Sequence, residues 1–337
     1  MSVLIGLIII AIGSFCQSSS YVPINKVKDW SWESFWLVQG VFAWLIFPLL
    51  GALLAVPSGS SLLDILSTDP TAAFKAIGYG VLWGVGGLTF GLSMRYLGVA
   101  LGQSISLGTC AGFGTLLPAI FGGMNLFSGK GLILLIGVCI TLAGIAVIGY
   151  AGVLRSKNMT DEEKRAAVKD FALTKGLAVA LLAGVMSACF NLGLEAGRSL
   201  QIEGSISLFK TLPATLMVTC GGFLTNAVYC LYQNKKNKTF CDYKKTKPMV
   251  NNLLFCALAG VLWYSQFFGF GIGSSFFAEG SVVAAFSWCI LMALNVTFSN
   301  VWGIILKEWK GVSTKTIGVL VSGLVILILS LIFPNLF

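Results

Sequence analysis

Long apolar stretches follow one another along almost the whole chain, separated by short polar segments that hold most of the charged residues. A helix needs about 20 mostly apolar residues to cross the hydrocarbon core of a bilayer. Strands of a membrane barrel would instead alternate apolar and polar residues, without long apolar runs. The pattern therefore predicts an all-α membrane protein with a tight turn near Arg95 and ten transmembrane helices, at residues 2–22, 34–56, 72–94, 97–120, 131–153, 176–197, 207–232, 251–272, 280–305 and 313–333.

Basic residues are distributed unevenly between the two sides of this predicted bundle. Ten spans place both termini on one side, where only four of the 22 Lys and Arg residues fall: Lys75, Lys130, Arg198 and Lys210. The other 18 lie on the opposite side, including six within 154–175 and six within 234–248. Cytoplasmic loops carry the excess of Lys and Arg. We therefore expect both termini to be periplasmic and residues 154–175 to form a cytoplasmic linker.

The two halves of the chain resemble each other. GVLW at 80–83, followed by FG at 90–91, recurs 180 residues later at 260–263 and 270–271, and KG at 130–131 recurs with the same offset at 310–311. More loosely, SFC at 14–16 resembles SAC at 187–189. Five helices in each half is an odd number, so the halves cross the membrane in opposite directions. The prediction is two inverted five-helix repeats, at 1–153 and 176–337, as in secondary transporters that bind substrate near the midplane.

Composition narrows the class further. Charged residues make up 10% of the chain, hydrophobic residues 56%, and mean hydropathy is +0.89. Soluble domains carry about a quarter charged residues, and disordered chains have low hydrophobicity, so both classes are excluded. The net charge of +9 lies in loops between apolar runs. We attribute it to anionic lipid headgroups rather than to nucleic acid.

Residues that carry metal or acid–base chemistry are scarce. There is no histidine, and the nine cysteines are scattered without a CxxC pair, so neither a disulfide framework nor a metal site is indicated. The spans hold no paired carboxylates of the kind that an enzyme would use. The apolar N-terminus lacks a basic segment, and we interpret it as a retained helix rather than a signal peptide. The sequence thus predicts neither an enzyme nor a bound cofactor.

Amide side chains inside the spans are candidates for binding a polar solute. An amide has donors and an acceptor to satisfy, which is costly in hydrocarbon unless a partner is present. A sugar offers several hydroxyl partners, whereas Ser and Thr in such helices usually bond the backbone or a neighbouring helix. The amides predicted to bind substrate are Gln17, Gln103, Asn191, Gln266 and Asn295.

Trp83 and Trp263 occupy equivalent places in the two predicted repeats. A sugar ring can stack its CH face on an indole, so both are predicted to be stacking platforms. The alternative is that they only fill the packing between the repeats, and the sequence does not decide between the two interpretations. The site is expected to include the first, third, fourth, sixth, eighth and ninth helices.

Proton coupling requires a titratable group, and without histidine it falls to a carboxylate. Glu195 lies well inside an apolar run and is the first candidate, and Glu279, at the start of the ninth helix, is the second. Arg198 follows Glu195 by three residues, so an ion pair on one helix face is the alternative. Glu33 and Glu308 stand beside lysines at the predicted cytoplasmic edge and are interpreted as loop charges.

Several short segments closely resemble the L-rhamnose–proton symporter family, part of the drug/metabolite transporter superfamily. They are SYVP at 20–23, KVKDWSWE at 26–33, GLSMRYLG at 91–98, LWYSQFF at 262–268 and LKEW at 306–309. The resemblance runs from the first helix to the tenth. It implies ten helices in inverted repeats, a bacterial inner-membrane location, and uptake of L-rhamnose or L-lyxose with a proton.

The chain departs from the pattern of the enterobacterial members at the start of the ninth helix. Ser287-Trp288 is preceded by Ala284, Ala285 and Phe286, without an acid. The coupling ion is therefore open at this point. The alternative function is a transporter of the same superfamily that carries another small solute, with sodium coupling or in the export direction.

Overall fold

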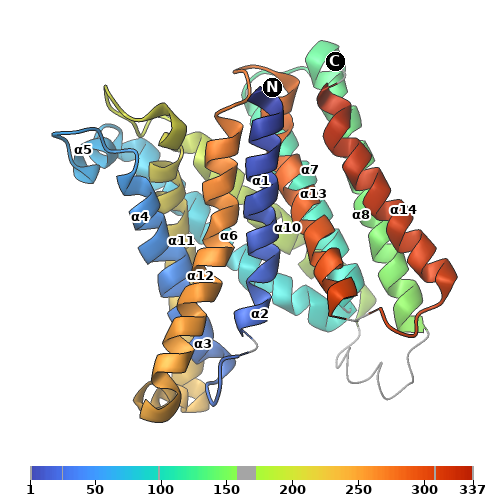
Figure 1. The fold of residues 1–337 in the computed structure, drawn as a ribbon. Coiled ribbons are helices and arrows are strands. Elements are labelled where there is room, and N and C mark those ends of the chain that lie inside the picture. Colours follow the sequence, from blue (N-terminus) through green and yellow to red (C-terminus); the bar gives the residue numbers. More distant parts are fainter. Residues whose placement is uncertain (1, 25, 98, 158–171, 307–308, 336–337) are drawn as a thin grey trace. The chain divides into compact units, whose positions relative to one another are not determined.

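The computed structural model describes residues 2–24, 26–97, 99–157, 172–306 and 309–335, which form helices joined by loops (Figure 1). Within these ranges nine helices are long and apolar enough to cross a membrane, and Val3–Ser19 is a shorter apolar helix. The nine are Trp32–Leu53, Pro70–Met94, Leu101–Phe121, Gly129–Arg155, Leu173–Ala196, Ser207–Asn237, Thr246–Ser274, Val282–Ile305 and Thr314–Ile332. The all-helical class and a set of nine to ten spans are thereby confirmed.

Two of the predicted connections between spans fall wholly or mostly outside the described residues. α6 (Pro70–Leu97) continues through Arg95, and α7 (Val99–Phe121) begins at Val99, so the tight turn expected near Arg95 falls on residue 98, outside the described residues. The predicted linker 154–175 falls mostly outside the described residues, because α8 (Gly129–Lys157) runs to Lys157 and α10 (Leu173–Ala196) begins at Leu173.

The chain divides into two compact units, and each combines segments from both halves of the sequence. Unit 1 comprises Met1–Gly84 and Leu192–Phe276, and unit 2 comprises Val85–Asn191 and Phe277–Phe337. The long helices α6 and α10 therefore contribute residues to both units. The repeat boundaries expected at residues 153 and 176 stay a prediction.

In unit 1, α1 (Ser2–Ser19) lies along α12 (Thr246–Ser274) (Figure 1). Glycines let these two backbones approach, since a Cβ at Gly13 would stand 3.2 Å from Gln266 Cα and one at Gly269 would stand 3.0 Å from the Ile9 carbonyl oxygen. The remaining elements are parts of α6 and α10, α2 (Tyr21–Ile24), α3 (Trp32–Gly40), η1 (Val41–Ile46), α4 (Phe47–Leu53), α5 (Leu62–Ser67), η2 (Ser207–Phe209), α11 (Leu212–Asn237) and η3 (Thr239–Lys244).

The second predicted span is not a uniform α-helix, because η1 between α3 and α4 is a π-helix. The Phe47 N–H bonds the carbonyl of Phe42, five residues earlier. Pro48 explains the change: proline has no N–H to donate, and its ring clashes with the carbonyl four residues before it, at Trp44. A wider turn just ahead of Pro48 relieves that clash without breaking the span.

In unit 2, α8 lies along α14 (Thr314–Ile332) (Figure 1), and here too glycines allow close approach. A Cβ at Gly144 would stand 2.8 Å from the Leu327 side chain, and one at Gly323 would stand 2.6 Å from that of Ile148. α7 (Val99–Phe121) packs against α8 and α13 (Val282–Ile305), and η4 (Phe333–Asn335) ends the unit. Its core includes the fully buried side chains Phe190, Phe286, Trp288, Ile290 and Leu291.

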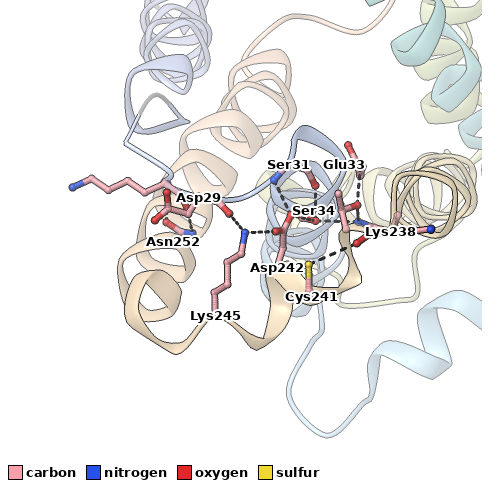
Figure 2. A network of polar contacts seen from close by, with 12 residues as sticks. Asp29, Ser31, Glu33, Ser34, Lys238, Cys241, Asp242, Lys245 and Asn252 are labelled. Carbon is pink, nitrogen blue, oxygen red and sulfur yellow. Dashed lines mark hydrogen bonds and ion pairs between the residues drawn. The ribbon is translucent and has the colours of Figure 1, made fainter.

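A network of polar contacts joins the segment before α3 to the segment around η3, within unit 1 (Figure 2). Asp242 is its centre and is only 3% exposed. Its carboxylate accepts hydrogen bonds from the Ser31 N–H at 2.8 Å and the Ser34 hydroxyl at 2.9 Å, and it pairs with Lys245 Nζ at 2.6 Å. The bonds from Ser31 and Ser34 join two segments that are about 210 residues apart in the chain.

The network predicts acid sensitivity. Burial alone would raise the pKa of Asp242, but Lys245, Ser31 and Ser34 together lower it from 3.8 to about 2. Because the folded pKa lies below the unfolded one, the stabilisation is present above about pH 4 and is lost as the pH falls towards 2. Asp242→Asn should therefore cost about 2 kcal/mol of stability at neutral pH, and it should flatten the stability curve between pH 4 and 2.

Thermal unfolding of the purified protein in detergent, measured across that pH range, tests the expectation. The exposed Glu203→Gln is the matched control and should behave as wild type. An Asp242→Asn protein with the wild-type pH profile would mean that the network does not stabilise unit 1.

Candidate substrate site

The structure brings the two predicted stacking platforms together within unit 1. Trp83 on α6 and Trp263 on α12 have ring centroids 5.8 Å apart, with their planes inclined by 35°. Trp83 also fills a notch on α11, because a Cβ at Gly222 would collide with its six-membered ring. Two aromatic rings in contact leave no room for a third ring between them, since each layer is about 3.5 Å thick. A sugar can therefore stack only on an outer face of this pair.

A third indole, which the sequence did not single out, touches both platforms. Trp44, from the π-helical η1, lies with its ring centroid 6.0 Å from that of Trp83 and 5.8 Å from that of Trp263. The planes cross at 87° and 81°, so Trp44 meets both rings edge-on. The hydrophobic pattern could not have indicated the π-helix, because it does not distinguish a π-turn from an α-turn. The sequence signal for the irregular turn was Pro48, four residues after Trp44.

Two of the predicted amides come from the neighbouring helices α1 and α12. Gln266 is buried, and its Nε2 donates to the Trp263 carbonyl oxygen at 3.2 Å. Gln17 is half-buried, and its Oε1 accepts from the Ser18 hydroxyl at 3.4 Å. Unit 1 thus holds both predicted indoles and two of the five predicted amides.

The other three amides belong to unit 2. Asn191 on α10 is buried, and its Nδ2 donates to the Gly114 carbonyl oxygen on α7 at 2.7 Å. This bond ties α10 to α7, so helix packing accounts for part of the polarity of Asn191. Asn295 is buried on α13, and Gln103 is half-buried on α7.

The two candidate carboxylates differ in their surroundings. Glu195 lies in the last turn of α10, and its Oε2 is 3.1 Å from Arg198 Nε, which confirms the ion pair weighed as the alternative. The pair is not sequestered, since the side chains are 39% and 70% exposed. Glu279 lies in the exposed loop that precedes α13, not in the helix.

Glu33 is not the loop charge that the sequence suggested. It lies in the first turn of α3 and is only 6% exposed. Its Oε1 accepts hydrogen bonds from Asn237 Nδ2 at 3.0 Å and from the Thr239 hydroxyl at 2.8 Å. These neutral donors come from more than 200 residues away, so no local pattern could have indicated the burial of this acid.

A cavity of about 650 Å³ lies in unit 2, along α7 and α8. Its lining is almost entirely apolar, with Leu, Ile, Ala and Gly side chains beside Phe113 and Tyr150, and none of the predicted site residues lines it. Among the described residues there is no cluster of His, Cys, Asp and Glu that could hold a metal ion. This cavity has the wrong polarity for a sugar.

These features define a class of protein. The described helices make a multi-pass membrane protein. Apart from the carboxylates of Glu33 and Asp242, the buried polar side chains of the described residues are mostly amides, hydroxyls and indoles. Such groups suit a carrier of polar solutes more than an enzyme.

Comparison with known proteins identifies the family. Residues 1–335 match the family model described as L-rhamnose-proton symport protein (RhaT). The chain is 32% identical over 345 residues to the L-rhamnose-proton symporter of Yersinia pestis (strain Pestoides F), covering 98% of this chain and 96% of that protein. It is 31% identical over 350 residues, with the same coverage, to the symporter of Yersinia pestis bv. Antiqua (strain Antiqua). The chain belongs to the L-rhamnose-proton symport protein family, and it is a multi-pass membrane transporter rather than an enzyme.

Proposed function

We propose that this protein imports L-rhamnose, with L-lyxose as a second substrate, together with a proton across a bacterial inner membrane. The observation that carries the proposal is the family match over residues 1–335, with relatives aligned along nearly their whole length. Transport follows an alternating-access cycle, in which the two inverted repeats expose the sugar first to one side of the membrane and then to the other.

One set of glycine contacts supports the inverted repeats. In unit 1, a Cβ at Gly221 would stand 2.9 Å from Gly80 Cα, and a Cβ at Gly260 would stand 2.7 Å from Phe42 Cβ. The 180-residue offset relates Gly80 to Gly260, and it relates Phe42 to Gly222, the neighbour of Gly221. The late half thus supplies the partner of Gly80, which is Gly221, and the early half supplies the partner of Gly260, which is Phe42. Two repeats related by a two-fold axis give such reciprocal contacts.

A second set follows the same rule. In unit 2, a Cβ at Gly86 would stand 2.9 Å from the Met186 carbonyl carbon, and in unit 1 a Cβ at Gly13 would stand 3.2 Å from Gln266 Cα. Gly86 and Gln266 are 180 residues apart, while Gly13 and Met186 differ by the 173 residues that separate SFC from SAC.

We further propose that both termini are periplasmic, because only four of the 22 Lys and Arg residues fall on the side of the termini and 18 fall on the other side.

The proposed site uses the groups that suit a deoxy sugar. Trp83 and Trp263 provide apolar faces for the CH side of the ring, and the amides provide hydrogen bonds to its hydroxyls. In unit 1, beside the two indoles, the amides are Gln17 and Gln266. Gln103, Asn191 and Asn295 belong to unit 2 and are proposed separately as substrate-binding residues. Glu195 is the proposed proton-coupling carboxylate and Glu279 the second candidate.

Uptake of labelled L-rhamnose into proteoliposomes tests the function. With one proton carried per sugar, each pH unit of an imposed inward proton gradient should multiply the ratio of internal to external sugar by about ten. A sodium gradient of the same size should add nothing, and a protonophore should abolish accumulation.

The other outcomes are equally informative. Accumulation driven by sodium would keep the sugar and discard the proton. Uptake that ignores both gradients would exclude symport. If L-rhamnose fails to stabilise the purified protein while another solute does, the protein is a transporter of the same superfamily that carries that other solute.

A further inference from the structure

The π-helical segment of unit 1 places one tryptophan in an unusual position. π-turns are rare and occur frequently at functional sites. Here the turn spans Val41–Ile46, and its residue Trp44 meets Trp83 and Trp263 edge-on. A regular helix would aim the side chain at this position in a different direction, because each residue of a π-turn adds less rotation than in an α-turn.

The indole of Trp44 is 4% exposed, and among the described residues its Nε1–H has no hydrogen-bond partner. Buried indole N–H groups usually find a partner, and an unsatisfied one is destabilising. Trp36 lies in the same span, with its ring centroid 5.6 Å from that of Trp44. Its indole has the usual partner, since Nε1 donates to Asn226 Oδ1 at 3.1 Å.

The backbone holds Trp44 in a fixed orientation. A Cβ at Gly40 would stand 2.7 Å from both Cε3 and Cζ3 of the indole. These atoms lie on the six-membered ring, on the side opposite Nε1. The edge that carries the N–H therefore points away from the helix that supports it, on a ring already packed against both proposed platforms.

We infer that Trp44 belongs to the sugar site and donates its Nε1–H to one hydroxyl of the bound sugar, while Trp83 and Trp263 supply the stacking faces. The inference rests on the proposed function, because it takes a hydroxylated ring as the ligand. It assigns to the site a hydrogen-bond donor that complements the amides. Trp44 thereby determines which hydroxyl pattern is accepted, since a buried donor left unpaired penalises a sugar that lacks the matching hydroxyl.

The test is a double-mutant cycle between the protein and the sugar. Binding of L-rhamnose and of analogues that each lack one ring hydroxyl is measured by calorimetry on wild type and on Trp44→Phe, which keeps a ring but removes the N–H. Wild type should bind the analogue that lacks the hydroxyl bonded by Trp44 about five- to tenfold more weakly than L-rhamnose. Trp44→Phe should lose this discrimination and bind L-rhamnose as weakly as it binds that analogue.

Trp36→Phe is the matched control, because its N–H is satisfied within the protein, and it should leave the analogue ranking unchanged. A Trp44→Phe protein with the wild-type ranking would overturn the inference, as would an equal weakening for every analogue, which indicates an N–H contact with a neighbouring ring instead. If Trp44→Phe folds poorly, indole ¹⁵N resonances of the wild type provide a second measurement. L-rhamnose must then shift the resonance that disappears in Trp44→Tyr, and the absence of any such shift overturns the inference.

The wild-type measurement separates this inference from the proposed function. If wild type binds neither L-rhamnose nor L-lyxose, the proposed function fails, and the role of Trp44 fails with it. If wild type binds L-rhamnose but Trp44→Phe keeps the wild-type discrimination between analogues, the proposed function stands and Trp44 has only a structural role.

Discussion

Replacing Gly80 with alanine should destabilise the protein severely and abolish uptake. Gly80 lies where α6 crosses α11, and an added Cβ would stand 2.9 Å from the carbonyl carbon and 3.0 Å from the Cα of Val218. These are backbone atoms, which cannot rotate aside as a side chain can. The two helices must separate, so we expect a loss of about 3 kcal/mol, at the upper end of overpacking costs. Size-exclusion melting curves in detergent measure the stability, and proteoliposomes measure the uptake.

Gly78→Ala is the matched control, because it lies on the same helix and a Cβ there meets nothing within 4 Å. Alanine is the better helix former by roughly 1 kcal/mol, so this variant should be as stable as wild type or slightly more stable. Gly260→Ala, the counterpart of Gly80 in the proposed repeat, should behave like Gly80→Ala. Equal melting temperatures for Gly78→Ala and Gly80→Ala would show that the crossing tolerates a Cβ and that the backbones are not in contact.

The positions of the helices were largely predictable because the membrane imposes a length and an apolar composition on each span. The ends were less predictable. The predicted span 207–232 continues as a helix to Asn237, and 251–272 begins already at Thr246 and ends at Ser274. The extra turns carry polar and charged residues that hydropathy assigns to loops. A helix extends beyond the hydrocarbon whenever its backbone hydrogen bonds and local contacts favour it, and hydropathy does not report on either.

The candidate site was predictable only where its members share a pattern. Trp83 and Trp263 were found because the internal repeat places them at equivalent positions, and the structure brings them into contact in unit 1. Trp44 has no counterpart in the GVLW match and was missed. Glu33 was misjudged because its burial depends on Asn237 and Thr239, which no local pattern connects to it. Side-chain partners supplied by distant segments are a property of the tertiary fold.

Glu195→Gln should uncouple sugar transport from the proton. Without histidine, proton carriage falls to a carboxylate. Glu195 lies in the last turn of a membrane-spanning helix, where Arg198 is its ion-pair partner among the described residues. Protonation removes that ion pair, so the pair links the charge of the carboxylate to the arrangement of the end of α10. Glutamine keeps the shape of the side chain but cannot exchange the proton. The accumulation ratio should therefore fall from about tenfold per pH unit to about one, while exchange of labelled for unlabelled sugar at equal pH stays within about threefold of wild type.

Two matched variants decide whether Glu195 alone carries this role. Glu279→Gln, in the exposed loop before α13, should retain gradient-driven accumulation, and if it loses accumulation while Glu195→Gln retains it, the coupling site is Glu279. Glu33→Gln separates stability from coupling, because this buried acid accepts bonds from Asn237 and Thr239 and its replacement should lower the melting temperature. If Glu33→Gln is stable yet uncoupled, the proton binds at the N-terminal end of α3. If Glu195→Gln instead loses both exchange and accumulation, the residue is needed for the translocation step itself. A coupling defect alone would leave the carrier able to exchange sugar.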